Sequence, residues 1–113
     1  MKMIVAVIQP EKLDDVREAL SQKEVSRLTV NHVSGHGQAK ETDLYRGKKV
    51  IPALTPKVRL EIACNDNFVE PIVSAIQEAA KSESGEAGAG KIFIMHLEDC
   101  IRIRTGERGQ SAI

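Results

Sequence analysis

Apolar residues along this chain fall into short runs whose spacing switches between strand and helix periods. The run Ile4–Ile8 is continuous and largely β-branched, which predicts a buried central strand. Residues 28–33 and 58–64 alternate between apolar and polar side chains, and residues 92–97 are mostly apolar, so each segment predicts a further strand. The short alternating segment 101–104 predicts a fifth strand, which would place Arg102 and Arg104 on one face.

Two amphipathic helices separate these strands. Pro10 is well tolerated in a first helical turn, and Asn67 with Glu70 predicts a capping box at the start of the second helix. The apolar residues at helical spacing are Leu13, Val16 and Leu20 in the first helix, and Val69, Val73, Ile76 and Ala80 in the second.

The predicted order β-α-β-β-α-β is the ferredoxin-like arrangement, an α+β fold with a four-stranded antiparallel sheet and two helices on one face. We expect one domain over residues 1–113. Ile4, Ala6 and Ile8 lie on one side of the first strand and Val5 and Val7 on the other, so both faces are apolar. The face without helices is therefore expected to pack against other copies of the chain.

Two polar segments interrupt the pattern. Residues 38–56 are charged and contain Gly47, Pro52 and Pro56, and they predict a long loop. Residues 81–89 are small and polar and predict a second, mobile loop. Loops as long as the first are usually functional in a compact domain.

Composition narrows the function classes. The formal net charge is zero and aromatic residues make up 3%, which disfavours binding to nucleic acid or to a membrane surface. No apolar run approaches the ~20 residues that cross a bilayer, and because residues 1–4 lead straight into a strand pattern we expect no signal peptide. Cys64 and Cys100 do not make a disulfide framework and are expected to be small buried residues, so we expect a cytoplasmic protein.

The stretch Gly88–Gly109 carries the clearest chemistry. Its glycines allow close approach of backbone N–H groups to a phosphate, and Lys91 follows at once. Arg102 and Arg104 add planar guanidinium groups that match phosphate geometry. The alternative interpretation is that Lys91, Arg102 and Arg104 form only a solvated basic strand edge. Within about twenty residues the pattern indicates one polyphosphate site, and hence a nucleotide binder or sensor.

Several separated motifs resemble the PII signal protein family over essentially the whole length. They are KLDDVREAL at Lys12–Leu20, the Gly-x-Gly at Gly35–Gly37, TDLYRG at Thr42–Gly47, PKVRLEI at Pro56–Ile62, GKIF at Gly90–Phe93 and IRIRTGE at Ile101–Glu107. The resemblance implies a non-enzymatic homotrimer that binds ATP or ADP between subunits. It also implies a T-loop at about 37–56 that acts on a target protein, a B-loop at about 82–90 and a C-terminal segment at 101–113.

The resemblance also assigns roles to individual residues. Arg102 and Arg104 would reach the phosphates from the neighbouring subunit, and Lys57 would be the counter-charge of a small effector, although a plain surface lysine is an equal interpretation. The other carried-over residues are Thr29, Glu61 and Ala63 near adenine or ribose, Gly88, Ala89, Gly90 and Lys91 in the phosphate loop, and Gly35, His36, Gly37 and Gln38 at the T-loop base.

Three positions depart from the family pattern. Val50 replaces the tyrosine that many relatives uridylylate, and valine has no hydroxyl to modify, so we expect no modification site in this loop. Ala89 replaces a larger residue of the phosphate loop, and the segment before that loop is about two residues longer. The T-loop base reads Gly37-Gln38-Ala39-Lys40, one residue short of the family pattern. Either Gln38 takes the role of the family's glutamine or that glutamine is missing too, and in both alignments the arginine that clamps the terminal phosphate of ATP is missing.

These departures shape the predicted function. We expect a sensor of AMP, ADP or ATP with weakened ATP preference, an uncertain role for Mg²⁺, and either 2-oxoglutarate or bicarbonate as the anion effector. Its target would be a transporter or a metabolic enzyme in nitrogen or inorganic-carbon metabolism. The alternatives are a phosphate-transferring enzyme, which would need carboxylates beside the glycine loop, and a purely structural trimer. His32 and His96 lack the spacing of a zinc site, and we expect no metal.

Overall fold

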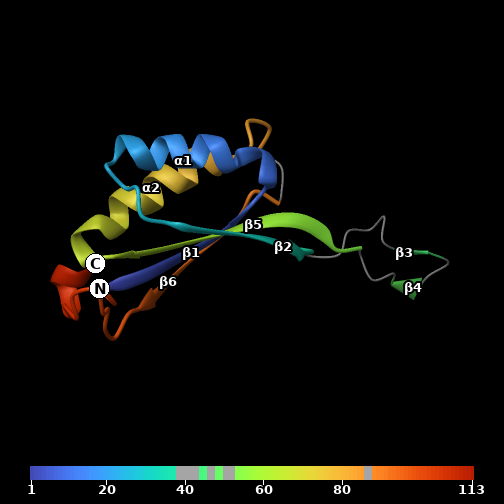
Figure 1. Cartoon of the computed structure of the whole chain (residues 1–113). Coiled ribbons are helices and arrows are strands. Elements are labelled where there is room, and N and C mark those ends of the chain that lie inside the picture. Colours follow the sequence, from blue (N-terminus) through green and yellow to red (C-terminus); the bar gives the residue numbers. More distant parts are fainter. Residues whose placement is uncertain (38–43, 46–47, 50–52, 86–87) are drawn as a thin grey trace.

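The computed structural model describes residues 1–37, 44–45, 48–49, 53–85 and 88–113. Four strands form one antiparallel sheet in the order β2-β5-β1-β6, and both helices cover the same face (Figure 1). This arrangement confirms the predicted ferredoxin-like fold. The elements are β1 at Lys2–Ile8, α1 at Leu13–Gln22, β2 at Thr29–Gly35, β5 at Thr55–Cys64, α2 at Val69–Ala80 and β6 at Gly90–His96.

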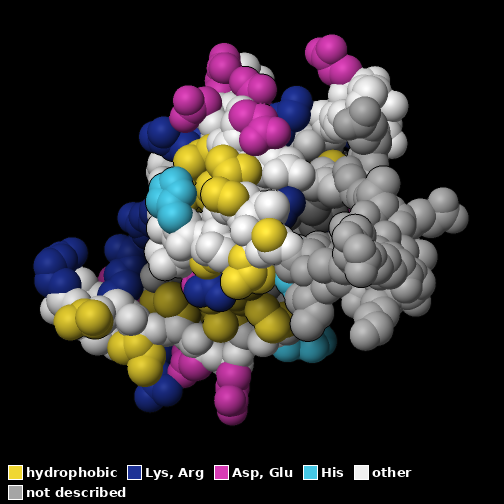
Figure 2. Space-filling model, turned by 90° about the vertical axis from the view of Figure 1, so that its right-hand side faces the viewer, with side chains coloured by type: hydrophobic (Ala, Val, Ile, Leu, Met, Phe, Trp, Pro, Cys, Tyr) yellow, Lys and Arg dark blue, Asp and Glu magenta, His cyan; other side chains and the backbone are white. Residues whose placement is uncertain are grey.

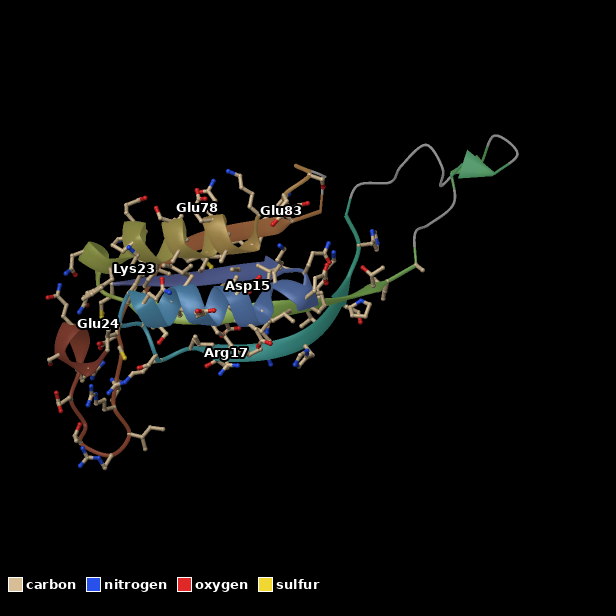
Figure 3. All side chains as sticks on the ribbon, turned by 90° about the horizontal axis from the view of Figure 1, so that it is seen from above. Asp15, Arg17, Lys23, Glu24, Glu78 and Glu83 are labelled. Atoms are coloured by element: carbon tan, nitrogen blue, oxygen red, sulfur yellow. The ribbon has the colours of Figure 1, made fainter. Side chains whose placement is uncertain are left out.

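The core lies between the sheet and the helices. Ile4, Ala6 and Ile8 face the helices and are at most 2% exposed, while Val16 and Leu20 of α1 are fully buried against them. Each buried Ile, Val or Leu side chain among these contributes about 1.5–3 kcal/mol through burial. Charged residues remain outside this layer: no charged side chain is buried among the described residues. Figure 3 shows Asp15, Arg17 and Glu78 on the outer surface of the helices, and Figure 2 shows a group of acidic side chains over the helix layer.

The opposite face of the sheet carries an apolar strip. Val5 lies opposite Phe93, and Met3 lies opposite Met95, in adjacent strands. Phe93 is 49% exposed and Met95 is 47% exposed, values that are high for large apolar side chains on a sheet face. Val7, on the same face of the sheet, continues this apolar strip toward the end of β1 at Ile8. Exposed apolar strips of this kind mark interaction surfaces.

The segment between β2 and β5 is more regular than its polar sequence predicts. β3 at Leu44–Tyr45 pairs antiparallel with β4 at Lys48–Lys49, and β5 begins at Thr55, inside the predicted loop. The predicted long loop over residues 38–56 is therefore wrong at residues 44–45, 48–49 and 55–56, which lie in paired strands, because backbone pairing needs no apolar alternation. The predictions on Gln38 and Val50 fall outside the described residues.

The predicted fifth strand at 101–104 is also wrong. Ile101 makes an isolated bridge with Arg108, and residues 103–105 form a turn. The Gly106 amide donates to the Arg102 carbonyl at 2.8 Å, and Gly106 has a φ of +74°, which reverses the chain. Because the segment turns, strand alternation does not place Arg102 and Arg104 on one face.

The capping box at Asn67 and Glu70 is a third wrong prediction. A 3₁₀ helix at Asp66–Phe68 contains Asn67 and leads directly into α2, and neither helical start has a side-chain cap. Asn65 precedes it and donates from Nδ2 to the Gln110 carbonyl at 3.2 Å. A similar 3₁₀ helix, Pro10–Lys12, precedes α1. The tighter turns take up the residues that the sequence pattern assigned to the first helical turns.

Asp66, which bonds the residues at the start of β1, makes the stability of the fold dependent on pH. Its Oδ1 accepts hydrogen bonds from the Met1 amino group and from Lys2 Nζ, both at 2.9 Å, and they lower the pKa of Asp66 from 3.8 to about 2. A carboxyl with a depressed pKa stabilises the fold above its ordinary pKa and loses this contribution as pH falls. We therefore expect the melting temperature to fall between about pH 4 and pH 2. Thermal melts of Asp66→Asn should show a shallower fall in that window, and parallel curves would contradict the assignment.

Candidate functional site

A hollow of about 500 Å³ lies at the end of the sheet where Ile8 pairs with Val58 and Gly90, here called the Ile8 end. It lies between the start of β6, the start of β5 and the residues that follow β2. The structure thus brings together two predicted groups of site residues from distant parts of the sequence. The predicted residues that line this hollow are Gly35, His36, Gly37, Lys57, Gly88, Gly90 and Lys91.

The glycine loop packs directly on the backbone of β1. Gly90 has a φ of +116°, and a Cβ added there would clash with the Val7 carbonyl oxygen, far inside the van der Waals contact distance. Gly88 has a φ of +99°, which also favours glycine. Lys91 follows at once and pairs with Val7 across the two strands. The glycines therefore set the path by which the chain brings Lys91 to the hollow.

Gln9 holds this loop and was missed by the sequence analysis. Its Nε2 donates to the Gly88 carbonyl oxygen at 2.7 Å. Gln9 stands between the first strand and Pro10, where the sequence pattern marks only a strand end. The contact spans 79 positions of sequence, so no periodicity could have indicated it.

The base of the segment between β2 and β5 forms the other wall. Thr55 Oγ1 donates to the Gly35 carbonyl at 3.1 Å, and a Cβ on Gly35 would meet Lys57 Cγ at 3.8 Å. His36 Nδ1 lies 3.2 Å from the Gly37 carbonyl oxygen. These contacts place a glycine backbone beside the half-buried Lys57 at the mouth of the hollow.

The charge of this hollow suits an anion. Lys57 and Lys91 line it, and no Asp or Glu does so in the described part of the chain. Ala89 lines a second hollow of about 420 Å³ against α2, which Gly90 and Lys91 also line. The loop residue that departs from the family pattern therefore lies outside the lining of the 500 Å³ hollow but beside Lys91.

The other predicted residues that the structure describes do not line the 500 Å³ hollow. Thr29 lies opposite Glu61 in mid-sheet, and Glu61 Oε1 pairs with Arg59 Nε at 3.2 Å. Ala63 lines a hollow of about 230 Å³ that Ile113 also lines, at the opposite or Lys2 end, where Lys2 pairs with Cys64 and His96.

Both arginines belong to this second end of the sheet. Arg102 Nε donates to the carbonyl of Ala112 at 3.0 Å, one residue before Ile113. Arg104 is exposed on the turn that follows. Figure 1 shows the C-terminal segment and both chain termini gathered at this end of the molecule, away from the start of β6.

The two ends are too far apart to form one site in one chain. β6 runs from Gly90 to His96, seven residues, and so spans about 20 Å. The interpretation of Gly88–Gly109 as one continuous phosphate site is therefore wrong for a single chain. The lysine end and the arginine end point instead to two half-sites.

Comparison with known proteins identifies this architecture. The family model described as "Nitrogen regulatory protein P-II" matches residues 1–107. The chain belongs to the P-II family. It is 48% identical over its whole length to the nitrogen regulatory protein GlnK1 of Methanosarcina mazei, covering 97% of that protein. It is 47% and 46% identical to the nitrogen regulatory proteins P-II of Haemophilus influenzae and Rhodospirillum rubrum, covering the whole of each.

Membership settles the broad class of function. P-II proteins are non-enzymatic signal transducers, so the chain is a nitrogen regulatory signal protein and not a phosphate-transferring enzyme. Proteins of the P-II family form trimers, regulate target proteins, and bind adenine nucleotides and 2-oxoglutarate.

Other sequence predictions concern metals, cysteines and membranes. Over the described residues no three His, Cys, Asp or Glu side chains gather into a metal-binding group, and no helix is long and apolar enough to cross a membrane. Cys64 is buried, as expected, and its burial raises the pKa of its thiol, whereas Cys100 is half-buried. Both thiols are free. His32 lies in β2 and His96 in β6, as predicted.

Proposed function

We propose that this P-II protein is a homotrimeric sensor of adenine nucleotides whose binding sites are each shared by two subunits. The observation that carries the proposal is the division of the predicted residues between the two ends of one sheet. Lys91 and the glycine loop lie at the Ile8 end, and Arg102 belongs to the Lys2 end. A ring of subunits in which the Ile8 end of one meets the Lys2 end of the next completes each site.

The apolar strip on the open sheet face supports the trimer. Val5, Phe93 and Met95 lie side by side there, and Phe93 is 49% exposed. Burying such a strip at about 25 cal/mol per Å² would drive association of identical subunits. A heterologous contact that closes after three subunits gives a ring and three equivalent sites.

Within each site, the proposed contacts follow the two half-sites. The B-loop (about 82–90) and Lys91 would hold phosphates, as would Arg102 and Arg104 of the neighbouring C-terminal segment (101–113). The proposed adenine and ribose contacts are Thr29, Glu61 and Ala63.

The shortened T-loop base would alter nucleotide preference. The alignments with relatives run over 114 positions, one more than the chain has residues, which agrees with a missing residue. Without the arginine that clamps the terminal phosphate, ATP loses charge-assisted hydrogen bonds worth roughly 1.5–3 kcal/mol each before desolvation. We therefore propose that ADP and ATP bind with similar affinity, and that Mg²⁺ matters less than in relatives.

Signalling would pass through the T-loop (about 37–56), whose base lines the hollow at Gly35–Gly37. Nucleotide and a small anion bound there, with Lys57 as counter-charge, would change how the loop is presented to a transporter or metabolic enzyme. The relatives' names point to nitrogen metabolism, so 2-oxoglutarate is the favoured anion. Val50 offers no hydroxyl, so the proposed signal is ligand binding without uridylylation of this loop. The proposal places the protein in the cytoplasm.

A thermal-shift screen tests this function. AMP, ADP and ATP are each added with and without 2-oxoglutarate or bicarbonate. We expect ADP and ATP to raise the melting temperature, and one anion to raise it further. A protein that no nucleotide stabilises would contradict the proposed sensor and favour a purely structural trimer. A response to bicarbonate alone would move the proposed pathway from nitrogen to inorganic carbon.

A further inference from the structure

The Asp99 carboxylate is the most heavily hydrogen-bonded side chain at the Lys2 end of the sheet. Its Oδ2 accepts from Arg108 at both Nε (2.9 Å) and Nη2 (2.6 Å). Its Oδ1 accepts from the backbone amides of Cys100 at 2.8 Å and Gly109 at 3.1 Å. These bonds lower the pKa of Asp99, the Arg108 contact most of all, so the group stays charged at neutral pH.

Three of these bonds, those from Arg108 and Gly109, join the two ends of one turn. Cys100 precedes the arginine segment and Gly109 follows it, and the Gly109 amide also approaches the Cys100 carbonyl at 2.9 Å. Inside the turn, the Arg102 amide donates to the Glu107 carbonyl at 3.0 Å. The side chain of Asp99 therefore closes the loop that carries Arg102 and Arg104.

The path of this turn decides where the two guanidinium groups lie. Arg102 is fixed by the bond from its Nε to the Ala112 carbonyl, and Ala112 is buried. Arg104 stands on the turn itself, whose neighbour Ile103 is fully exposed. Among the described contacts, Asp99 supplies the side-chain hydrogen bonds that join the two ends of the turn, and without them backbone bonds alone would join these ends. The path of the turn, and with it the placement of both arginines, would then be less tightly fixed.

We propose that Asp99, held by Arg108, is a positioning residue that aims Arg102 and Arg104 at the phosphates of a nucleotide bound to the neighbouring subunit. This inference rests on the proposed function and adds a residue to it. Asp99 acts through the arginines and need not touch the nucleotide. Its removal should therefore weaken contacts to phosphate while leaving contacts to adenine and ribose in place.

The test compares ADP with adenosine, which lacks phosphates. Calorimetry should show that Asp99→Asn binds ADP about tenfold more weakly, the equivalent of one charge-assisted hydrogen bond, because an amide nitrogen cannot accept from Arg108. Adenosine affinity should change less than about twofold. Arg108→Gln, which leaves the two backbone bonds of Asp99 intact, should show a smaller loss in the same direction. Asp99→Glu, which keeps the carboxylate, should recover part of the ADP affinity.

Asp66→Asn is the matched control. Asp66, like Asp99, is a carboxylate held by cationic groups, here the Met1 amino group and Lys2, but it holds the start of β1 and not the arginine turn. It should lower thermal stability without changing the ratio of ADP to adenosine affinity. An unchanged ADP affinity in Asp99→Asn and Arg108→Gln, or an equal loss for ADP and adenosine, would overturn the inference alone. Failure of the unmodified protein to bind ADP would overturn the proposed function with it.

Discussion

Neither Lys91→Ala nor Arg102→Ala protein is expected to bind ADP, yet trimers assembled from a mixture of the two should bind it. Each substitution removes charge-assisted hydrogen bonds to phosphate worth about 1.5–3 kcal/mol, or roughly ten- to hundredfold in affinity per bond. In the proposed trimer, Lys91 and Arg102 of one site come from different chains. A mixed trimer therefore contains one interface at which both residues are intact.

The size of the recovery makes the experiment quantitative. After the two variants are unfolded and refolded together in equal amounts, random assembly should restore about a quarter of the wild-type number of ADP sites, because about three in four trimers are mixed. Calorimetry gives this number as the stoichiometry of tight binding, and each variant refolded alone is the control. If both variants lose binding and the mixture restores none, the site lies within one chain. Undiminished ADP affinity in both single variants would contradict the site assignment itself.

The second large effect is expected for Gly90→Ala. A methyl group at this position would collide with the Val7 carbonyl oxygen, and a φ of +116° is one that alanine rarely adopts. The β1–β6 pairing would have to open at the Ile8 end to admit it. We expect the free energy of unfolding to fall by about 3 kcal/mol or more, and ADP binding to be lost in the folded fraction because Lys91 follows directly.

Gly85→Ala separates the cost of the collision with the Val7 carbonyl from the cost of the left-handed backbone conformation. Gly85 also has a left-handed backbone, with a φ of +69°, but an added Cβ there meets no atom of the described residues within 4 Å. This control should cost about 1–2 kcal/mol, the price of the backbone conformation alone. Denaturant unfolding of both variants measures the difference. Equal unfolding midpoints would show that the contact between Gly90 and the Val7 carbonyl does not constrain the loop.

The sheet and helices were predictable because burial repeats with a period. Ile4, Ala6 and Ile8 alternate with Val5 and Val7, so their placement on two faces of the sheet was predictable, and the structure shows that the first set lies against the helices. The same rule failed at Ile101–Arg104, where the alternation is genuine but the chain turns. A segment of four residues is too short for periodicity to outweigh the glycines that follow it.

The candidate site was predictable in its residue types but not in its geometry. Glycines beside Lys91 indicate phosphate chemistry from sequence alone, because close approach and charge are properties of the residues themselves. The distance between Lys91 and Arg102 depends instead on β6, which runs along the sheet from the Ile8 end to the Lys2 end. The closeness of the two residues in sequence gives no sign of this separation. One hydrogen bond joins Gln9 to Gly88, which is far away in sequence. The spacing of apolar and polar residues gives no sign of such a contact.

The placement of the two half-sites at opposite ends of one sheet has a genetic consequence. In the proposed ring, every chain contributes to two nucleotide sites: its Lys91 lines the site shared with one neighbour, and its Arg102 lines the site shared with the other. A chain that carries both Lys91→Ala and Arg102→Ala would therefore abolish nucleotide binding at both sites to which it contributes, while still assembling into trimers. Produced alongside the unaltered protein, such a chain would act as a dominant inhibitor of sensing.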